Sequence, residues 1–202
     1  MQALILAKHA LLPVNSRPAA VRTPQQLRII GGAWRSRRIA IADRPDLRPT
    51  PDRVRETLFN WLGQQLAGET CADLYAGSGA LGFEAASRGA GRVVMVERDP
   101  VAVAALARNR TLLGAQAVEI VRGGALEYLR RSDERFDVVF LDPPFRQDPW
   151  RELLDLLPAR LAPAARVYLE AARPIEAPPP WSELRRGRAG QVSYQLLQWS
   201  EA

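Results

Sequence analysis

Short apolar runs alternate along most of the chain with longer stretches in which apolar residues recur at helical spacing. Each apolar run is typical of a buried strand, and we expect strands at 72–75, 92–96, 118–121, 137–141 and 166–169. We expect helices at 51–68, 80–88, 100–113, 125–130 and 150–157. The alternation predicts an α/β fold with a doubly wound, mostly parallel sheet and helices on both faces.

Both ends of the chain depart from this alternation. Residues 181–188 and 192–199 are extended stretches around a glycine turn, and we expect an antiparallel pair that completes a seven-stranded sheet at its edge. Residues 27–32 and 39–42 flank another glycine turn, which predicts a small N-terminal β-hairpin. The chain therefore divides into a flexible extension (1–26), a basic hairpin with its linker (27–50) and a main domain (51–202).

The basic residues are concentrated near the N-terminus. Residues 1–60 carry 11 basic and 4 acidic side chains, whereas the rest of the chain carries 17 and 18. This segregation is typical of a polyanion-binding segment attached to a nearly neutral domain. Near the hairpin tip, Trp34, Arg35, Arg37 and Arg38 predict RNA contact through phosphate pairing and base stacking. The alternative is a solvated turn with Trp34 folded onto the domain.

The scarcity of cysteine and histidine excludes several kinds of site. Cys71 is the single cysteine and His9 the single histidine. An internal disulfide, a cysteine-based zinc site and a histidine-dependent triad are therefore not expected, and we expect no metal. No apolar run approaches the roughly 18 residues of a membrane span, and no signal peptide is recognisable. These features predict a cytoplasmic protein.

An acidic motif follows the apolar strand at 137–141. Asp142, Pro143, Pro144 and Phe145 stand directly after it, and the two prolines stop the strand and stiffen the backbone. Ligands bind at the carboxyl ends of strands in open parallel sheets. A carboxylate, rigid carbonyls and an aromatic ring in that place suit a planar group that carries an amine.

A glycine-rich turn follows the first strand of the main domain. Residues 77–82 match G-x-G-x-x-G, and Glu97 ends the next strand, where an acid can take a ribose diol. Both features also fit a dinucleotide site. Asp73 argues against a dinucleotide site, because a carboxylate four residues before Gly77 would repel a pyrophosphate. Asp73 can instead order the loop or meet a ligand ammonium.

Taken together, the glycine loop, Glu97 and the D-P-P-F motif resemble class I S-adenosylmethionine (SAM)-dependent methyltransferases, whose Rossmann-like fold agrees with the predicted sheet. D-P-P-F is similar to the [DN]-P-P-[FYW] motif of enzymes that methylate exocyclic amines of bases. The resemblance implies that Asp142 and the Pro143 carbonyl accept hydrogen bonds from the amine. It also implies that Phe145 stacks on a base flipped into the pocket.

The resemblance extends to the RsmD family of bacterial methyltransferases. It is carried by the stretches 28–37, 47–62, 73–84, 136–145 and 190–194, and it covers about residues 27–200. It implies methylation of the N2 amine of one guanine in 16S rRNA, with SAM as cofactor and the assembled or assembling small subunit as substrate. We expect a monomer. The residues implied to bind SAM are Thr50, Arg53, Asp73, Tyr75, Gly77, Ser78, Gly79, Glu97, Arg98, Gly124 and Ala125; those implied to bind RNA are Trp34, Arg35, Arg37, Arg38 and Arg55.

One position departs from the family pattern. Gly124 stands where an Asp or Asn usually precedes an alanine and meets the adenine amine, so that side-chain contact is missing. The backbone N–H of Ala125 can still bond the adenine ring, and we expect the site to survive with weaker cofactor binding. The alternatives are the same chemistry on adenine N6 or another nucleic acid, a nicotinamide oxidoreductase, and a non-catalytic rRNA-binding module.

Overall fold

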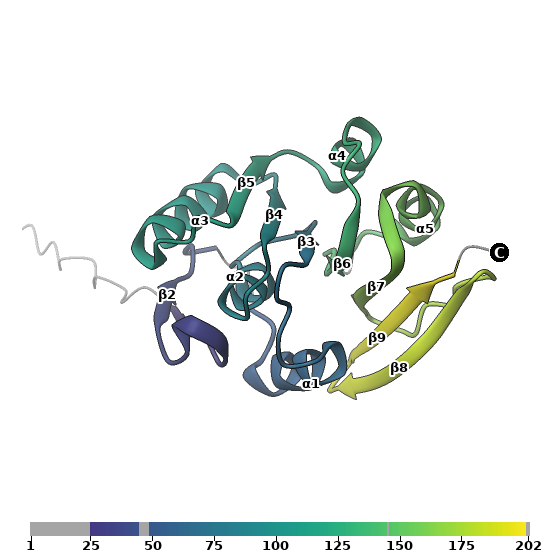
Figure 1. Cartoon of the computed structure of the whole chain (residues 1–202), viewed down its shortest axis with the longest axis horizontal. Coiled ribbons are helices and arrows are strands. Elements are labelled where there is room, and N and C mark those ends of the chain that lie inside the picture. The colour runs from purple at the N-terminus through teal and green to yellow at the C-terminus, as the bar shows by residue number, and fades with distance from the viewer. Residues whose placement is uncertain (1–24, 45–48, 145, 201–202) are drawn as a thin grey trace, which may run out of the picture.

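A seven-stranded sheet forms the centre of the molecule (Figure 1). The computed structural model describes residues 25–44, 49–144 and 146–200. The strand order is β5-β4-β3-β6-β7-β9-β8; β3 to β7 are parallel, and β9 and β8 are antiparallel additions at one edge. This confirms the predicted sheet. The strands are β3 (Thr70–Asp73), β4 (Arg92–Glu97), β5 (Val118–Arg122), β6 (Phe136–Leu141), β7 (Leu161–Ala171), β8 (Trp181–Ala189) and β9 (Val192–Trp199).

Helices cover both faces of the sheet, as Figure 1 shows. Helices α1 (Asp52–Leu62), α2 (Ala80–Ser87) and α3 (Pro100–Leu113) bury one face, and α4 (Ala125–Arg131) and α5 (Trp150–Leu156) bury the other. A short 3-10 turn, Leu157–Arg160, leads from α5 into β7. Two apolar cores result, one on each side of the sheet. Cys71 lies in the first, and burial raises the pKa of its thiol, so the group stays protonated and unreactive.

Helix α3 has the bounds that the sequence predicts, because it carries a clear signal at each end. The Asp99 side chain accepts hydrogen bonds from the N–H groups of Val101 and Ala102, which caps the N-terminus. Pro100 occupies the first turn, where its missing N–H costs nothing. Gly114 ends the helix in the left-handed conformation with φ 64°.

Two elements have an end that lies five residues or more from the predicted position. Helix α1 ends at Leu62 rather than near residue 68, because Gly63 takes φ 90° and breaks the helical path. Strand β7 begins at Leu161 instead of 166. Its early residues include Ala164 with φ 59°, and the pairing with β6 shifts register there. An irregular strand of this kind leaves no clear alternation in the sequence.

The predicted N-terminal hairpin is present as a separate two-stranded sheet. Strands β1 (Gln26–Arg28) and β2 (Arg38–Ala40) pair antiparallel, and a 3-10 turn, Gly32–Trp34, lies between them. Its apolar residues join the core that α1, α2 and α3 bury. Gly32 has φ 72°, and a Cβ atom there would lie 1.8 Å from the Ser87 carbonyl oxygen at the end of α2. The hairpin is therefore packed tightly onto the main domain.

Four parts of the sequence predictions lie outside the described residues: 1–24 of the extension, 45–48 of the linker, Phe145, and 201–202 of the main domain. Within the part of the chain that the structure describes, no helix has the length and apolar character needed to cross a membrane.

Candidate active site

Three acidic side chains gather at the carboxyl edge of the parallel strands. Asp73 ends β3, Asp142 follows β6, and Glu170 is the penultimate residue of β7. Strand β6 lies between the other two, with Asp73 paired to Phe140 and Leu141 paired to Leu169. The sheet order thus brings together the two acids that the sequence singled out, and it adds Glu170, which the sequence analysis missed.

Burial raises the pKa values of all three acids, and repulsion from neighbouring carboxylates raises those of Asp73 and Asp142 further. Asp73 is 3% exposed, and desolvation is the largest cause that raises its pKa to about 7. Desolvation followed by the charges of Glu170 and Asp73 raises the pKa of Asp142 well above its usual range. Desolvation also raises the pKa of Glu170. Among the described residues, no arginine or lysine forms an ion pair with any of these acids. The cluster therefore suits a ligand that brings positive charge.

The glycine loop is ordered from both sides by carboxylates. Asp73 Oδ2 accepts a hydrogen bond of 2.9 Å from the Gly82 N–H in α2. Glu97 Oε2 accepts one of 2.9 Å from the Gly77 N–H, and its other oxygen accepts from Asp99 N–H at 2.8 Å. Gly79 takes φ 81°, directly before α2. Asp73 and Glu97 thus flank the loop at the ends of adjacent strands.

The remaining predicted SAM residues surround this loop at different depths. Ser78 is buried, Tyr75 and Gly77 are partly buried, and Arg98 is exposed. Gly124 precedes α4, and a Cβ atom built on it would meet nothing within 4 Å. The space that an Asp or Asn side chain would fill is therefore open.

The D-P-P-F motif leaves β6 at the acidic cluster. Asp142 is partly buried, Pro143 is buried and Pro144 is exposed. Phe145 lies outside the described residues, so its stacking role stays a prediction.

The segment before α1 reaches the same cluster. Thr50 is buried and its hydroxyl donates a hydrogen bond to the Glu170 carboxylate. Thr50 does not cap the helix, since Pro51 occupies that position without a side-chain cap. Arg53 is exposed. The contact of Thr50 links the linker after the hairpin to the edge of the sheet where Asp142 lies.

Arg55 corrects the sequence analysis. It was expected on the outside of α1 among the RNA-binding residues, yet its side chain is 0% exposed. Its guanidinium donates to Glu84 at 3.2 Å, to Asp52 at 2.6 Å and to the Arg28 carbonyl at 2.8 Å. A buried guanidinium with these partners is a structural link between the hairpin and the domain. It offers no surface to RNA.

Glu84 is the centre of that link, and the sequence carried no motif that marks it. Its two carboxylate oxygens accept from the N–H groups of Ile30 and Gly31 at 3.0 and 2.7 Å. They also accept from the guanidinium groups of Arg55 and Arg88. A buried carboxylate thus receives bonds from the hairpin, α1 and α2 together. The available signal in the sequence was that this acidic residue lies within the apolar stretch of α2, where a buried carboxylate needs partners.

The other hairpin residues differ in their surroundings. Trp34 is partly buried and packs against the core, as the alternative reading of the turn expected. The Arg37 guanidinium donates to the Leu112 carbonyl at 2.6 Å. Arg35 and Arg38 are exposed. Among the tip arginines, Arg35 and Arg38 are thus the two without a bond to the domain.

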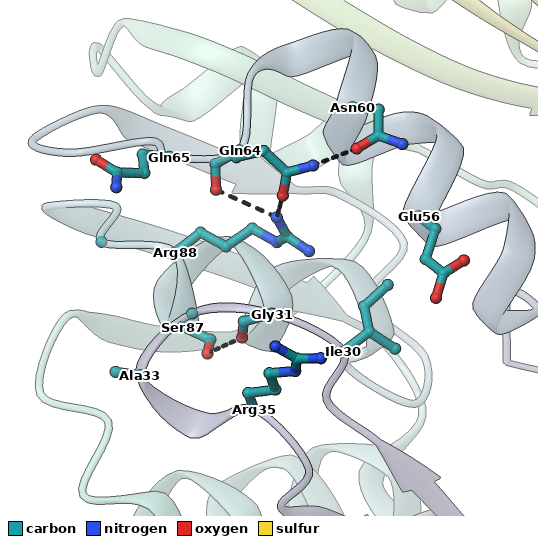
Figure 2. Close-up of a pocket in the computed structure, with 12 residues that line it drawn as sticks. Ile30, Gly31, Ala33, Arg35, Glu56, Asn60, Gln64, Gln65, Ser87 and Arg88 are labelled. Atoms are coloured by element: carbon teal, nitrogen blue, oxygen red, sulfur yellow. Dashed lines mark hydrogen bonds between the residues drawn. The ribbon is translucent and has the colours of Figure 1, made fainter.

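Arg35 lines a hollow between the hairpin turn and the C-terminal ends of α1 and α2. Figure 2 shows this hollow, which has a volume of about 680 Å³. Arg88 donates to the Gln64 carbonyl and side-chain oxygens at 3.2 and 2.8 Å, and Gln64 donates to Asn60. The side chains of Arg88, Gln64 and Asn60 thus largely satisfy one another's hydrogen-bonding groups. The hollow is therefore a polar surface beside the hairpin, apart from the acidic cluster.

Known proteins are similar to this chain in sequence and in fold. The family model described as "Conserved hypothetical protein 95" matches residues 27–198. Ribosomal RNA small subunit methyltransferase D of Escherichia coli is 42% identical over 180 residues, which is 86% of this chain and 90% of that protein. Its namesake in Haemophilus influenzae is 39% identical over 189 residues, 88% of this chain and 98% of that protein. The solved structure of yhhF from Escherichia coli has a TM-score of 0.81 at 41% identity, covering 88% of this chain and 100% of that one.

These matches span the hairpin as well as the main domain, and they agree with the class I methyltransferase fold expected from the strand order. On this basis the chain belongs to the family of ribosomal RNA small subunit methyltransferase D.

Proposed function

We propose that the protein transfers the methyl group of SAM to the exocyclic N2 amine of one guanine in 16S rRNA of the small ribosomal subunit. The observation that carries this proposal is the cluster of Asp73, Asp142 and Glu170, which lacks a cation among the described residues. A ligand with an ammonium and a sulfonium supplies the missing positive charge. The pyrophosphate of a dinucleotide would add negative charge beside the same acids, which disfavours a nicotinamide enzyme.

The residues around the glycine loop fit SAM. Glu97 would take the ribose hydroxyls, Asp73 the ammonium, and the Ala125 N–H an edge of the adenine. When bound, SAM supplies a methyl group on a sulfonium that is already activated for transfer. The contribution of the protein is then mainly to align the acceptor amine with that methyl group.

Asp142 and the Pro143 carbonyl would align the amine. A guanine amine is a poor nucleophile because its lone pair is delocalised into the ring. Hydrogen bonds from its N–H groups to these two acceptors would localise the lone pair and direct it. Pro143 is buried, so its carbonyl would be held in place. Phe145 would stack on the flipped base.

The hairpin would hold the rRNA. Arg35 and Arg38 are exposed and free to meet phosphates, and the hollow beside Arg35 offers room for an unpaired part of the RNA. Trp34 would present only the part of its ring that the core leaves uncovered. We also propose that the protein acts as a monomer in the cytoplasm.

The test is methylation with labelled SAM. Unmethylated small subunits, naked 16S rRNA and duplex DNA serve as separate substrates, and the methylated nucleoside is identified after digestion. We expect N2-methylguanosine in rRNA, and loss of labelling in Asp142→Ala with SAM binding retained. N6-methyladenine, or label in DNA alone, would contradict the proposal. Binding of rRNA with no labelling by the wild type would favour a non-catalytic binding module.

A further inference from the structure

Asp142 and Glu170 lie side by side at the carboxyl ends of the neighbouring strands β6 and β7. Leu141 of β6 pairs with Leu169 of β7 in parallel register. Asp142 directly follows Leu141 and Glu170 directly follows Leu169, so this register sets the two residues roughly 5 Å apart on the same face of the sheet. The charge of Glu170 raises the pKa of Asp142, in keeping with this closeness.

Solvent can do little to screen the charge of Glu170 from that of Asp142. It is 5% exposed. The Tyr168 hydroxyl donates to its Oε1 at 2.9 Å, and the Thr50 hydroxyl donates as well. These two donors stabilise the charged form of Glu170. Asp142 receives no such bond from a described residue.

Among the described residues, the other titratable groups that act on the pair add no positive charge. Asp73 on β3 acts on Asp142 and raises its pKa further. The ring of Tyr168 lies 6.4 Å from that of Tyr194 on β9. Burial with the neighbouring acids raises the pKa of Tyr168 well above its usual range, so it stays a hydroxyl. Two adjacent carboxyl groups, one buried and one partly buried, do not both ionise near neutral pH in such surroundings. The hydroxyl donors leave the negative charge on Glu170 and the proton on Asp142.

We propose that Glu170 is a positioning residue that acts through Asp142: the two carboxyl groups hold one proton between them and together accept the proton that the substrate amine releases. This inference rests on the proposed function. It gives Glu170 a role in the proton balance of the reaction, while Asp142 remains the group that touches the amine.

The step balances in atoms and charge. The amine nitrogen forms a bond to the methyl carbon as the bond from that carbon to sulfur breaks, and the sulfonium becomes a neutral thioether. The nitrogen then carries a positive charge and gives one proton to the pair. The pair changes from one negative charge to none, which offsets the positive charge lost from sulfur.

The test is the pH profile of methyl transfer by Glu170→Gln on unmethylated small subunits. In this variant Asp142 itself must carry the negative charge, at a partly buried position without hydroxyl donors. We expect kcat to fall about a hundredfold at pH 7. We also expect the acid limb of the profile to move up by about one pH unit. SAM affinity and the KM for small subunits should change little.

Two further variants separate this role from a structural one. Glu170→Asp keeps a carboxyl group and should retain the wild-type pH dependence at a reduced rate. Glu183→Gln on β8 is the control for exchanging an acid for an amide elsewhere in the sheet, and it should leave rate and profile unchanged. A rate loss in Glu170→Gln that is equal at every pH, with a lowered melting temperature, would overturn the proposal. A wild type inactive on small subunits would instead overturn the proposed function.

Discussion

Arg55 and Glu84 form an ion pair from which water is excluded on both sides. Arg55 Nη1 lies 3.2 Å from Glu84 Oε2, and both side chains are 0% exposed. The two residues are 29 positions apart in the chain and belong to α1 and α2. Because Glu84 also accepts from the backbone of the hairpin, this pair fixes the hairpin to the domain.

Removing Glu84 should therefore destabilise the whole protein. Glu84→Ala leaves the Arg55 charge buried without its partner, and we expect a loss of about 3–5 kcal/mol in the free energy of unfolding. Urea denaturation followed by circular dichroism measures it. Glu119→Ala is the control, since its ion pair with Arg92 is about half exposed and should cost less than about 1 kcal/mol. Equal losses in the two variants would show that burial of the pair is unimportant.

The pKa of Asp73 predicts a pH-dependent stability. Its pKa rises from 3.8 in the unfolded chain to about 7 in the fold, so the folded protein holds this proton more tightly. The resulting stabilisation is full below pH 3.8 and is lost as the pH rises through about 7. The side chain of Asp73→Asn stays neutral. Between pH 5 and pH 8 the free energy of unfolding of this variant should therefore fall by roughly 2–4 kcal/mol less than that of the wild type. Parallel losses in both proteins would refute this assignment.

SAM affinity should also depend on the ionisation of Asp73, but it should rise with pH where the stability falls. A bound ammonium favours ionised Asp73, so wild-type affinity is expected to rise with pH through about 7. Calorimetry in buffers of different ionisation enthalpy should show proton release on binding. The Asp73→Asn variant should bind more weakly and with a flatter pH dependence.

Charge reversal in the hairpin should weaken rRNA binding. Arg35→Glu with Arg38→Glu is expected to lower affinity for 16S rRNA and to reduce the slope of its dependence on salt concentration. SAM affinity should stay constant. Arg37 is left intact because its bond to the Leu112 carbonyl holds the hairpin against α3. Reversal of Arg131 and Arg151, on the helices of the opposite face, is the matched control. A similar loss there would indicate a general effect of net charge.

A side chain at position 124 should improve cofactor binding. Gly124→Asp would enter open space and add an acceptor for the adenine amine, and one such bond is worth about 1 kcal/mol, or roughly fivefold in Kd. Calorimetric titration with SAM measures it. Gly123→Asp, which also meets open space, is the control and should leave affinity unchanged. Tighter binding by both variants would point to a nonspecific charge effect.

The sequence predicted those elements whose signals are local. Helix α3 has a capping aspartate, a proline and a terminal glycine within its own residues, and its bounds are as predicted. The signals for strand β6 and for the D-P-P segment that ends it likewise lie in consecutive residues. The early part of β7 depends on its pairing with β6 across a register shift, and no local pattern reveals that.

Residues whose role depends on distant partners were missed or misplaced. Arg55 was expected at the surface because a lone arginine is rarely buried, and its partner Glu84 lies on another helix. Glu170 stands in an apolar strand without a motif, and it gains meaning only from the register that sets it beside Asp142. In both cases the information lies in the tertiary arrangement of two segments.

The contact of Gly32 with α2 limits what evolution can do at the hairpin. Any larger residue there would have to adopt φ 72° and would also meet the Ser87 carbonyl at 1.8 Å. Backbone cannot yield as a flexible side chain can, so no substitution is neutral at this position. Substitutions at the exposed Arg35 and Arg38 leave this contact intact, whereas any side chain at position 32 would push the hairpin away from the end of α2.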